Sequence, residues 1–269
     1  MDIKPLERGI LLLDKPDTLT SMQCVEKAKA ILNARKAGHS GTLDPKVTGL
    51  MLIAFNEATK AMPVLIGLVK RYDGIMKVHG AFSRDQLEQA ARKFEGRIIQ
   101  TPPRRSAVAR KPRERGVLSF EILSARGSDV MFRVSCEAGT YVRKLCHDIG
   151  EHMGTGAHMA ALRRTGIGPF SISDAVKIEQ LNDEGERCLF PLEKALDMVG
   201  LPKAAVSGEV QEKLRNGVFP DISELSGLPE KMPPGLFGIC SAGGCLLALA
   251  SIRGKKVKPE RVFSQSSCT

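Results

Sequence analysis

The spacing of the apolar segments constrains the fold of this chain more than any other feature of its sequence. Segments with an unbroken apolar run or a period of two residues predict strands, and a turn or one amphipathic helix separates each from the next. The predicted strands are 9–14, 50–55, 72–79, 117–124 and 130–136. Strands and helices therefore follow one another without strict alternation. This order indicates an α+β fold with a mixed sheet.

Helix signals occupy several gaps between these strands. The predicted helices begin at Thr20 or Ser21, at Ser83 and at Thr140. Ser83 and Gln86 form a capping box, in which the two residues satisfy free amides of the first turn. Thr140 is expected to cap the third helix. Residues 57–68 could also be helical, and Pro63 predicts a kink or a split within them.

The sequence pattern changes near residue 200, where we predict a domain boundary. Residues 201–217, LPKAAVSGEVQEKLRNG, then predict a short helix that ends at Gly217. The segment LFGICSAGGCLLALASI then reads as a hairpin with its turn at Ala242-Gly243-Gly244. The chain is thus expected to consist of one large domain and one small domain.

The net charge indicates a polyanionic partner. The 269 residues contain 40 Lys and Arg against 30 Asp and Glu, which gives a net charge of +10 and a pI near 9.4. Nucleic acid is favoured over a membrane surface, because no basic amphipathic helix stands out. On charge alone, a basic surface without any partner remains possible. The absence of Trp and the presence of only two Tyr argue against repeated base stacking.

Membrane insertion and metal binding are not expected. No apolar run approaches the roughly 18 residues that a membrane span requires. The first residues lack a signal-peptide cleavage site, so a cytoplasmic location is expected. Seven cysteines form no C-x-x-C pair and no two histidines have the i,i+4 spacing of a helical site.

Residues 97–115 form a strongly basic segment. Seven Arg or Lys stand there against one acid, and its prolines disfavour regular structure. A solvated charged loop is the plainer interpretation. Phosphate contact is favoured because guanidinium groups bind phosphate at two points. The candidate phosphate-binding residues are Arg104, Arg105, Arg110 and Arg113.

The segment AGHSGTLDPKVTG contains a single acid, Asp44, directly before Pro45. Its glycines could form a phosphate-binding turn, but Asp44 would repel phosphate and no Gly-Lys-Ser/Thr follows. Asp44 could instead cap a turn, which is the common use of an Asp-Pro pair. A carboxylate fixed for nucleophilic or acid–base chemistry is the third interpretation. Composition and spacing leave the last two open.

An ordered set of motifs resembles a known family. The motifs are LLLDKP, AGHSGTLDPKVTG, KRY, EAGTYVRKL and AHMAALRRTGIGPF. Together they resemble the TruB family of pseudouridine synthases. RSAVARKPRERGV and SCEAGTYVRKLCHDIG are similar to its archaeal and eukaryotic branch, the dyskerin-like subunits of H/ACA ribonucleoproteins. The resemblance covers about residues 8–195, and residues 200–265 resemble a PUA domain, a small β-barrel-like RNA-binding module.

This resemblance implies a pseudouridine synthase fold with a central mixed, mainly antiparallel sheet. It also implies isomerisation of uridine to pseudouridine without a cofactor or metal. Asp44 would be the nucleophile, and Tyr72 would pack on the base and help remove the C5 proton. Arg143 would pair with Asp44 and keep that carboxylate ionised in a largely buried pocket.

Further residues take supporting roles by the same resemblance. His39 matches a histidine that contacts the flipped region of the RNA, and Leu162 matches an apolar residue of the pocket. Lys15 and Pro16 match a motif that braces the catalytic loop. Gly41 is expected to help fix the carboxylate in place.

The resemblance leaves two RNA targets open. One is rRNA selected by an H/ACA guide RNA with companion proteins, and the other is the T-loop uridine of tRNA modified by the protein alone. The link between the Tyr72 strand and the Ser83 helix is short, whereas bacterial members carry an insertion there, and this favours the guide-directed target. A non-catalytic RNA-binding scaffold is the alternative outside the enzymes.

Overall fold

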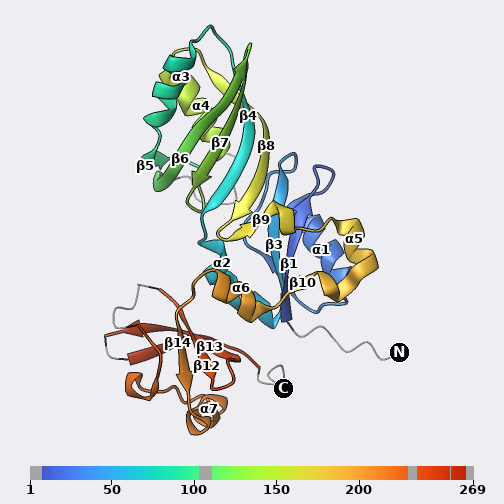
Figure 1. Cartoon of the computed structure of the whole chain (residues 1–269), viewed down its shortest axis with the longest axis vertical. Coiled ribbons are helices and arrows are strands. Elements are labelled where there is room, and N and C mark those ends of the chain that lie inside the picture. The colour runs from blue at the N-terminus through green and yellow to red at the C-terminus, as the bar shows by residue number, and fades with distance from the viewer. Residues whose placement is uncertain (1–7, 103–110, 230–234, 255, 265–269) are drawn as a thin grey trace.

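The chain forms two β-sheets of unequal size (Figure 1). The computed structural model describes residues 8–102, 111–229, 235–254 and 256–264. Within these residues the large sheet has ten strands, in the order β10-β1-β3-β8-β4-β7-β6-β5, with β2 beside β3 and β9 beside β8. Its strands are β1 (Arg8–Lys15), β2 (Ala37–His39), β3 (Thr48–Asn56), β4 (Lys70–Val78), β5 (Gly96–Gln100), β6 (Arg113–Arg126), β7 (Asp129–Cys136), β8 (Ala157–Ile167), β9 (Phe170–Ser171) and β10 (Leu189–Phe190).

The large sheet is mixed and mainly antiparallel, as predicted. Among its described pairings, β3 with β8 is the parallel one, and it joins Thr48 to Arg163 and Gly49 to Arg164. The other pairings of this sheet are antiparallel. β8 therefore lies at the centre of the sheet, between the strand that follows Asp44 and the strand that carries Tyr72.

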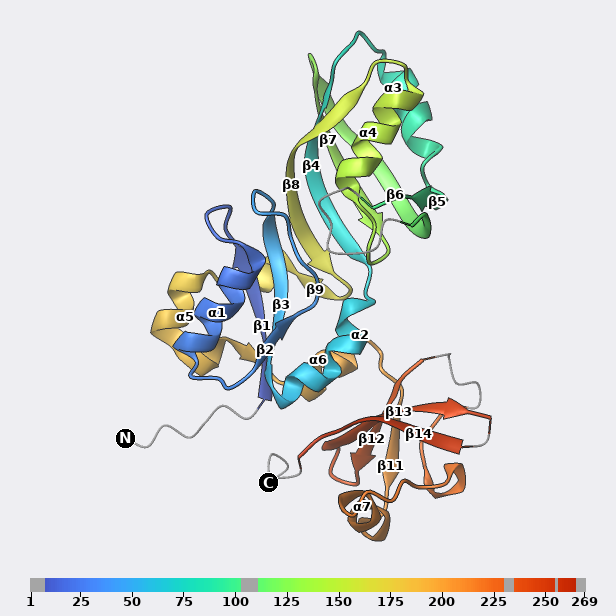
Figure 2. The same ribbon diagram turned by 180° about the vertical axis from the view of Figure 1, so that it is seen from behind.

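Helices cover both faces of the large sheet. Four of them pack with one continuous apolar core: α1 (Ser21–Ile31), α3 (Arg84–Arg92), α4 (Val142–His152) and α5 (Ile178–Glu184). Figure 2 shows α3 and α4 over one half of this face and α1 and α5 over the other half. A second core on the opposite face contains η1 (Glu57–Ala61), α2 (Met62–Ile66) and α6 (Leu192–Met198). The short 3₁₀ helices η2 (Ile172–Asp174) and η3 (Gly185–Cys188) complete this part of the chain.

The unbroken apolar runs of the sequence are strands buried on both faces. In β3, Met51, Ile53 and Phe55 point into the first core, whereas Leu50 and Leu52 point into the second. Alternate side chains of a strand lie on opposite faces of the sheet. When both faces are covered, every position is buried, so the sequence shows an unbroken apolar run instead of alternating apolar and polar residues.

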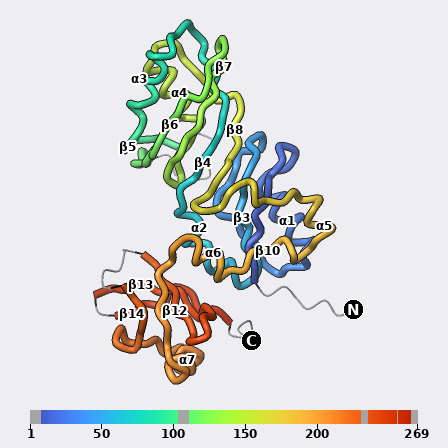
Figure 3. Tube along the Cα trace, viewed as in Figure 1, coloured from blue at the N-terminus to red at the C-terminus, as the bar shows by residue number. Residues whose placement is uncertain are grey.

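The small sheet is formed by the C-terminal residues (Figure 3). Its strands, in spatial order, are β11 (Lys203–Val206), β12 (Phe237–Ser241), β13 (Leu246–Arg253) and β14 (Lys256–Val262), and α7 (Gly208–Arg215) and η4 (Ile222–Glu224) follow β11 in the chain. The predicted hairpin is β12 and β13, which pair antiparallel. Leu246, Leu249 and Phe263 belong to the second core, so the small sheet shares apolar packing with the large sheet.

The helix predictions agree with the structure except at two points. The short helix predicted for residues 201–217 begins only at Gly208, because residues 203–206 form β11 and pair with β12. The Ser83–Gln86 capping box is present, and residues 57–68 are split into η1 and α2, with Pro63 in the first turn of α2. The expected cap at Thr140 is wrong, because α4 begins one residue later, with Tyr141 as its N-cap and no side-chain cap bond. None of the helices in the described parts of the chain is both long enough and apolar enough to cross a bilayer.

Candidate active site

Asp44 lies on the loop between β2 and β3, which we call the Asp44 loop (residues 40–47). Its turn closes with a hydrogen bond from the Val47 amide to the Asp44 carbonyl oxygen (2.9 Å). Gly41 has a φ of +142°, a conformation that favours glycine. The Asp44 side chain is 53 % exposed. The expectation of a largely buried carboxylate is therefore wrong, because this irregular loop lies on the surface and presents its acid to solvent.

Lys15 anchors the C-terminal end of the Asp44 loop. Its side chain is fully buried, and its ammonium group donates to the carbonyl oxygens of Pro45 (3.0 Å) and Val47 (2.9 Å). It also donates to the carbonyl oxygen of Pro16 (2.7 Å). Burial lowers the pKa of Lys15. Three carbonyl oxygens thus replace the water that this ammonium group would otherwise bind.

Two further anchors were not indicated by the sequence pattern. Ser21, at the start of α1, exchanges two hydrogen bonds with the Leu43 backbone, at 3.0 and 2.9 Å. Arg164 of β8 donates to the carbonyl oxygens of Gly41 (3.1 Å) and Leu50 (2.6 Å) and is 1 % exposed. The motif around Arg164 was part of the family resemblance, but nothing in its spacing marked this arginine as buried.

Arg143 pairs with Asp44 across the front of the site. It lies in the first turn of α4, and its Nη2 donates to the Asp44 carboxylate. The two side chains are 59 % and 53 % exposed. The structure therefore brings the predicted pair together, but in solvent. An exposed ion pair contributes only about 0–1 kcal/mol to stability, so this contact orients the carboxylate more than it stabilises the fold.

Tyr72 lies behind this pair, on β4. It is 9 % exposed, and a register shift between Arg71 and Tyr72 places it opposite Arg164 of β8. Burial raises the pKa of the Tyr72 phenol, and the charge of Asp44 adds to this effect. The positive charge of the Arg164 guanidinium opposes both effects. The site therefore combines an open carboxylate with a buried phenol.

His39 borders the Asp44 loop, and Leu162 lies on β8, where it pairs in register with Gly74 of β4. His39 ends β2, and its Nδ1 accepts a hydrogen bond from the Gly41 amide (3.2 Å). Burial and the charge of Arg164 lower the pKa of His39. Leu162, on β8, is partly buried against the first core, and a Cβ added at Gly74 would lie 2.9 Å from its Cδ1. The predicted contacts of both residues with RNA stay predictions.

The basic segment is only partly described. Arg104, Arg105 and Arg110 lie outside the described residues. Arg113 is half-buried at the start of β6, where it pairs in register with Gln100 of β5. The predicted phosphate contacts of these arginines stay predictions.

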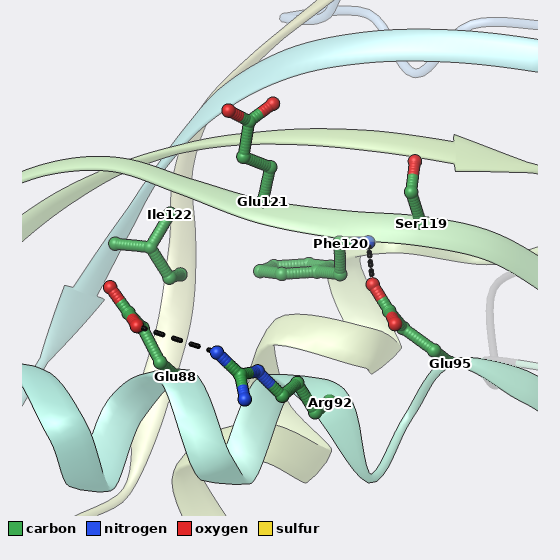
Figure 4. Close-up of a pocket in the computed structure, with 7 residues that line it drawn as sticks. All are labelled: Glu88, Arg92, Glu95, Ser119, Phe120, Glu121 and Ile122. Atoms are coloured by element: carbon green, nitrogen blue, oxygen red, sulfur yellow. Dashed lines mark hydrogen bonds and ion pairs between the residues drawn. The ribbon is translucent and has the colours of Figure 1, made fainter.

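A pocket elsewhere is separate from this site. It lies between α3 and β6 and is lined by residues such as Glu88, Glu95 and Phe120 (Figure 4). Glu95 accepts a hydrogen bond from the Phe120 amide (2.7 Å), and no predicted site residue lines the pocket. Within the described residues, no three His, Cys, Asp or Glu side chains are grouped as a metal site would require.

This geometry suits chemistry on a ligand that arrives from solvent. A carboxylate fixed at an exposed turn can act as a nucleophile or a base. The phenol of Tyr72 can release its proton and, once it is a phenolate, take one up. Both groups are fixed by the backbone of the Asp44 loop and by β4, so they need little rearrangement before a reaction.

Comparison with known proteins gives a family. Residues 29–142 match the model of the TruB family pseudouridylate synthase N-terminal domain, and residues 143–197 match that of the tRNA pseudouridylate synthase B C-terminal domain. A probable tRNA pseudouridine synthase B of Methanopyrus kandleri is 49 % identical over 187 residues, which are 68 % of this chain and 55 % of that protein. One from Methanothermobacter thermautotrophicus is 36 % identical over 94 % of this chain and 78 % of its own length.

Solved structures agree with these matches. The crystal structure of a Cbf5–Nop10–Gar1 complex contains a chain that is 36 % identical, with a TM-score of 0.86 over 95 % of this chain and 85 % of that one. The structure of an H/ACA RNP bound to a substrate RNA containing 2′-deoxyuridine contains another, 34 % identical, with a TM-score of 0.83 over the same shares. From these matches, the chain belongs to the TruB family of pseudouridine synthases.

Proposed function

We propose that this protein isomerises uridine to pseudouridine in rRNA selected by an H/ACA guide RNA. The observation that carries the proposal is the arrangement of Asp44, Arg143 and Tyr72 on a fold that superimposes on Cbf5 chains over 95 % of its length. Those chains were solved with Nop10 and Gar1, or in a complex with substrate RNA, so we propose companions of the same kind here.

The proposed reaction breaks the C1′–N1 bond of the uridine, turns the base and joins C1′ to C5. A proton leaves C5 and a proton is gained at N1, so the reaction needs no oxidant and no cofactor. Asp44 acts as the nucleophile at C1′ or as the base for the 2′ proton. We propose that Tyr72 relays protons: its phenol gives up its own proton as N1 gains one, and the phenolate takes the proton that leaves C5. Arg143 holds the carboxylate in position.

The C-terminal residues 200–265 are proposed to be a PUA domain that holds RNA. Their small sheet shares an apolar core with the part of the chain that carries Asp44. RNA bound to the small sheet is therefore held at a fixed position relative to Asp44. The net charge of +10 supports binding of the phosphate backbone.

A second candidate is a tRNA pseudouridine synthase that acts without a guide. The names of the relatives favour it, since several are described as probable tRNA pseudouridine synthase B. Mapping of pseudouridine in tRNA and rRNA transcripts separates the candidates, with purified protein alone and with guide RNA and companion proteins added. Modification of rRNA only with guide supports the first candidate, and modification of tRNA by the protein alone supports the second.

The variant Asp44→Asn tests catalysis by either route. The amide keeps the shape of the side chain but is neither a nucleophile nor a base. We expect the rate to fall by at least about 1000-fold, while RNA affinity, measured by filter binding, changes by less than about threefold. An equal loss in RNA affinity would refute the chemical role, and wild-type protein without activity on any RNA would favour the scaffold.

A further inference from the structure

Arg164 is the largest fully buried side chain in the described part of the protein. It is 1 % exposed, and arginine is almost never buried to this extent without a partner. In that part of the chain its hydrogen bonds go to two backbone carbonyl oxygens, and it forms no ion pair with a carboxylate. Removing a guanidinium from water costs several kcal/mol, which is comparable to the net free energy of unfolding of a whole domain. A role beyond packing would account for its retention.

The contacts of Arg164 bracket the Asp44 loop. Its Nη2 donates to Gly41, three residues before Asp44, and its Nε donates to Leu50, six residues after it. One planar guanidinium therefore fixes Gly41, near the start of the Asp44 loop, relative to Leu50 of β3, the strand that follows the loop. A Lys ammonium has no such fork and could not hold two carbonyl oxygens in the same fixed geometry.

The backbone of Arg164 is fixed as firmly as its side chain. It pairs with Gly49 in the parallel β3–β8 contact and with Tyr72 in the antiparallel β4–β8 contact. The approach to Gly49 is so close that an added Cβ would lie 2.2 Å from the Arg164 carbonyl oxygen. Arg163 and Arg164 are the two positions of β8 that pair with both β3 and β4, and Arg164 is the one of them that lies opposite Gly49 and Tyr72.

We infer that Arg164 is a positioning residue for the isomerisation, which sets the Asp44 carboxylate relative to the Tyr72 phenol. It ties Gly41 of the Asp44 loop and Leu50 of β3 to β8, and its own backbone pairs with Tyr72 of β4. This inference rests on the proposed activity, because it concerns the same site.

The test measures rate and RNA affinity separately. Single-turnover rates and dissociation constants are compared for wild type, Arg164→Lys and Arg164→Met on one guide-selected substrate. A displacement of about 1 Å in a reacting group lowers the rate by about 100-fold. We therefore expect that loss for Met and about a tenfold loss for Lys, with affinity within about threefold of wild type.

Arg163→Met is the matched control. Arg163 is the neighbouring arginine of β8, but it is 43 % exposed, and its guanidinium binds the carboxylate of Asp14 (2.7 Å) and the hydroxyl of Thr48 (3.3 Å). None of its hydrogen bonds goes to Gly41, Leu50 or Tyr72. Its variant should keep the rate within about threefold of wild type while losing some thermal stability. This separates loss of a β8 arginine from loss of the Asp44 loop contacts.

A spectroscopic readout detects the contact with Tyr72 directly. The charged or titratable groups that face this phenol are Arg164, Cys136 and Asp44. Arg164 lowers the pKa of Tyr72, so Arg164→Met should raise it, which is seen as later appearance of phenolate absorbance on alkaline titration. Tyr72→Phe identifies the contribution of Tyr141 to that signal.

Each outcome decides the inference. A folded Arg164→Met with wild-type rate and an unchanged phenol titration overturns it, as does a rate loss fully explained by weaker RNA binding. If the Met variant does not fold, rates are measured for Arg164→Lys, Tyr72→Phe and the double variant. Rate losses that simply add in free energy would show that the two residues act independently, which overturns the inference. Inactive wild-type protein would instead refute the proposed function.

Discussion

At the scale of single residues, the exposed Asp44–Arg143 pair separates catalysis from stability. Both side chains lie more than half in solvent, so the pair contributes little to folding. We expect Arg143→Met to lower the rate by about 100-fold, the usual effect of removing one preorganised donor. The midpoint of urea unfolding should shift very little. Arg143→Lys keeps the positive charge but loses the planar guanidinium, so its rate should lie between those of wild type and Arg143→Met. An unfolding midpoint reduced as strongly as the rate would contradict this separation.

Lys70 gives a prediction on pH. It is 4 % exposed and donates to the carbonyl oxygens of Ile66 (2.5 Å) and Leu68 (2.6 Å). Burial, followed by the charge of Arg164, lowers the pKa of Lys70 to about 8 in the folded protein. Between this pKa and the ordinary value of 10.5, the unfolded chain binds the additional proton. Raising the pH through this range therefore favours the folded state at this residue.

Comparison with Lys70→Met isolates this effect. The free energy of unfolding of wild type minus that of Lys70→Met should increase from about pH 7 to about pH 10. Tyr72 and Cys136 have raised pKa values and act in the opposite direction, but they are present in both proteins. Urea unfolding at several pH values measures the difference. A difference that stays constant or falls would show that Lys70 is not held in the folded state as described.

At the scale of elements, the Asp44 loop depends on the close contact of β3 with β8. Gly49 has a φ of +107°, and an added Cβ would meet the Arg164 carbonyl oxygen at 2.2 Å. Gly49→Ala should therefore destabilise the protein by about 3 kcal/mol or more. Gly67 is the control, because an added Cβ there meets nothing within 4 Å and its φ is −71°. Gly67→Ala should be neutral or stabilising by up to about 1 kcal/mol. Thermal unfolding measures both, and equal effects would contradict the contact.

The same elements show what the sequence can and cannot predict. β1, β3, β4 and the Ser83–Gln86 cap were predicted, because their signals lie in consecutive residues. β8 was not predicted as a strand, although it is central, since its residues HMAALRRTG neither alternate nor form an apolar run. β8 is a strand because it pairs with β3 on one side and β4 on the other, and these pairings are visible only in the tertiary structure.

The candidate site divides in the same way. Asp44, Tyr72 and Arg143 were predicted from the family motifs, and the structure places them together. The exposure of Asp44 and the burial of Arg164 were not predicted. Both depend on how β3, β4 and β8 meet, so they are properties of long-range pairing rather than of any local spacing.

At the scale of the whole molecule, one apolar core joins the large sheet to the small sheet. Phe263, which follows β14, is 2 % exposed and packs within the core that also contains residues of η1 and α6. Around it, the Ser264 amide donates to the Glu57 carboxylate (2.8 Å), and the Lys60 ammonium lies 5.8 Å from the centre of the Phe263 ring. The two sheets should therefore unfold together in the wild-type protein.

Two optical signals test this coupling, because the chain has no Trp and both of its tyrosines, Tyr72 and Tyr141, lie in the part with the large sheet. Tyrosine fluorescence thus reports on that part alone, whereas far-ultraviolet circular dichroism reports on both sheets. In wild type the two thermal transitions should coincide. Phe263→Ala removes about 3–5 kcal/mol of packing, so circular dichroism should show an earlier step that tyrosine fluorescence lacks. Val262→Ala, at a neighbouring residue that is 40 % exposed, should leave the transitions together. Separate transitions in the wild type, or an unchanged single transition in Phe263→Ala, would show that the shared core does not couple the sheets.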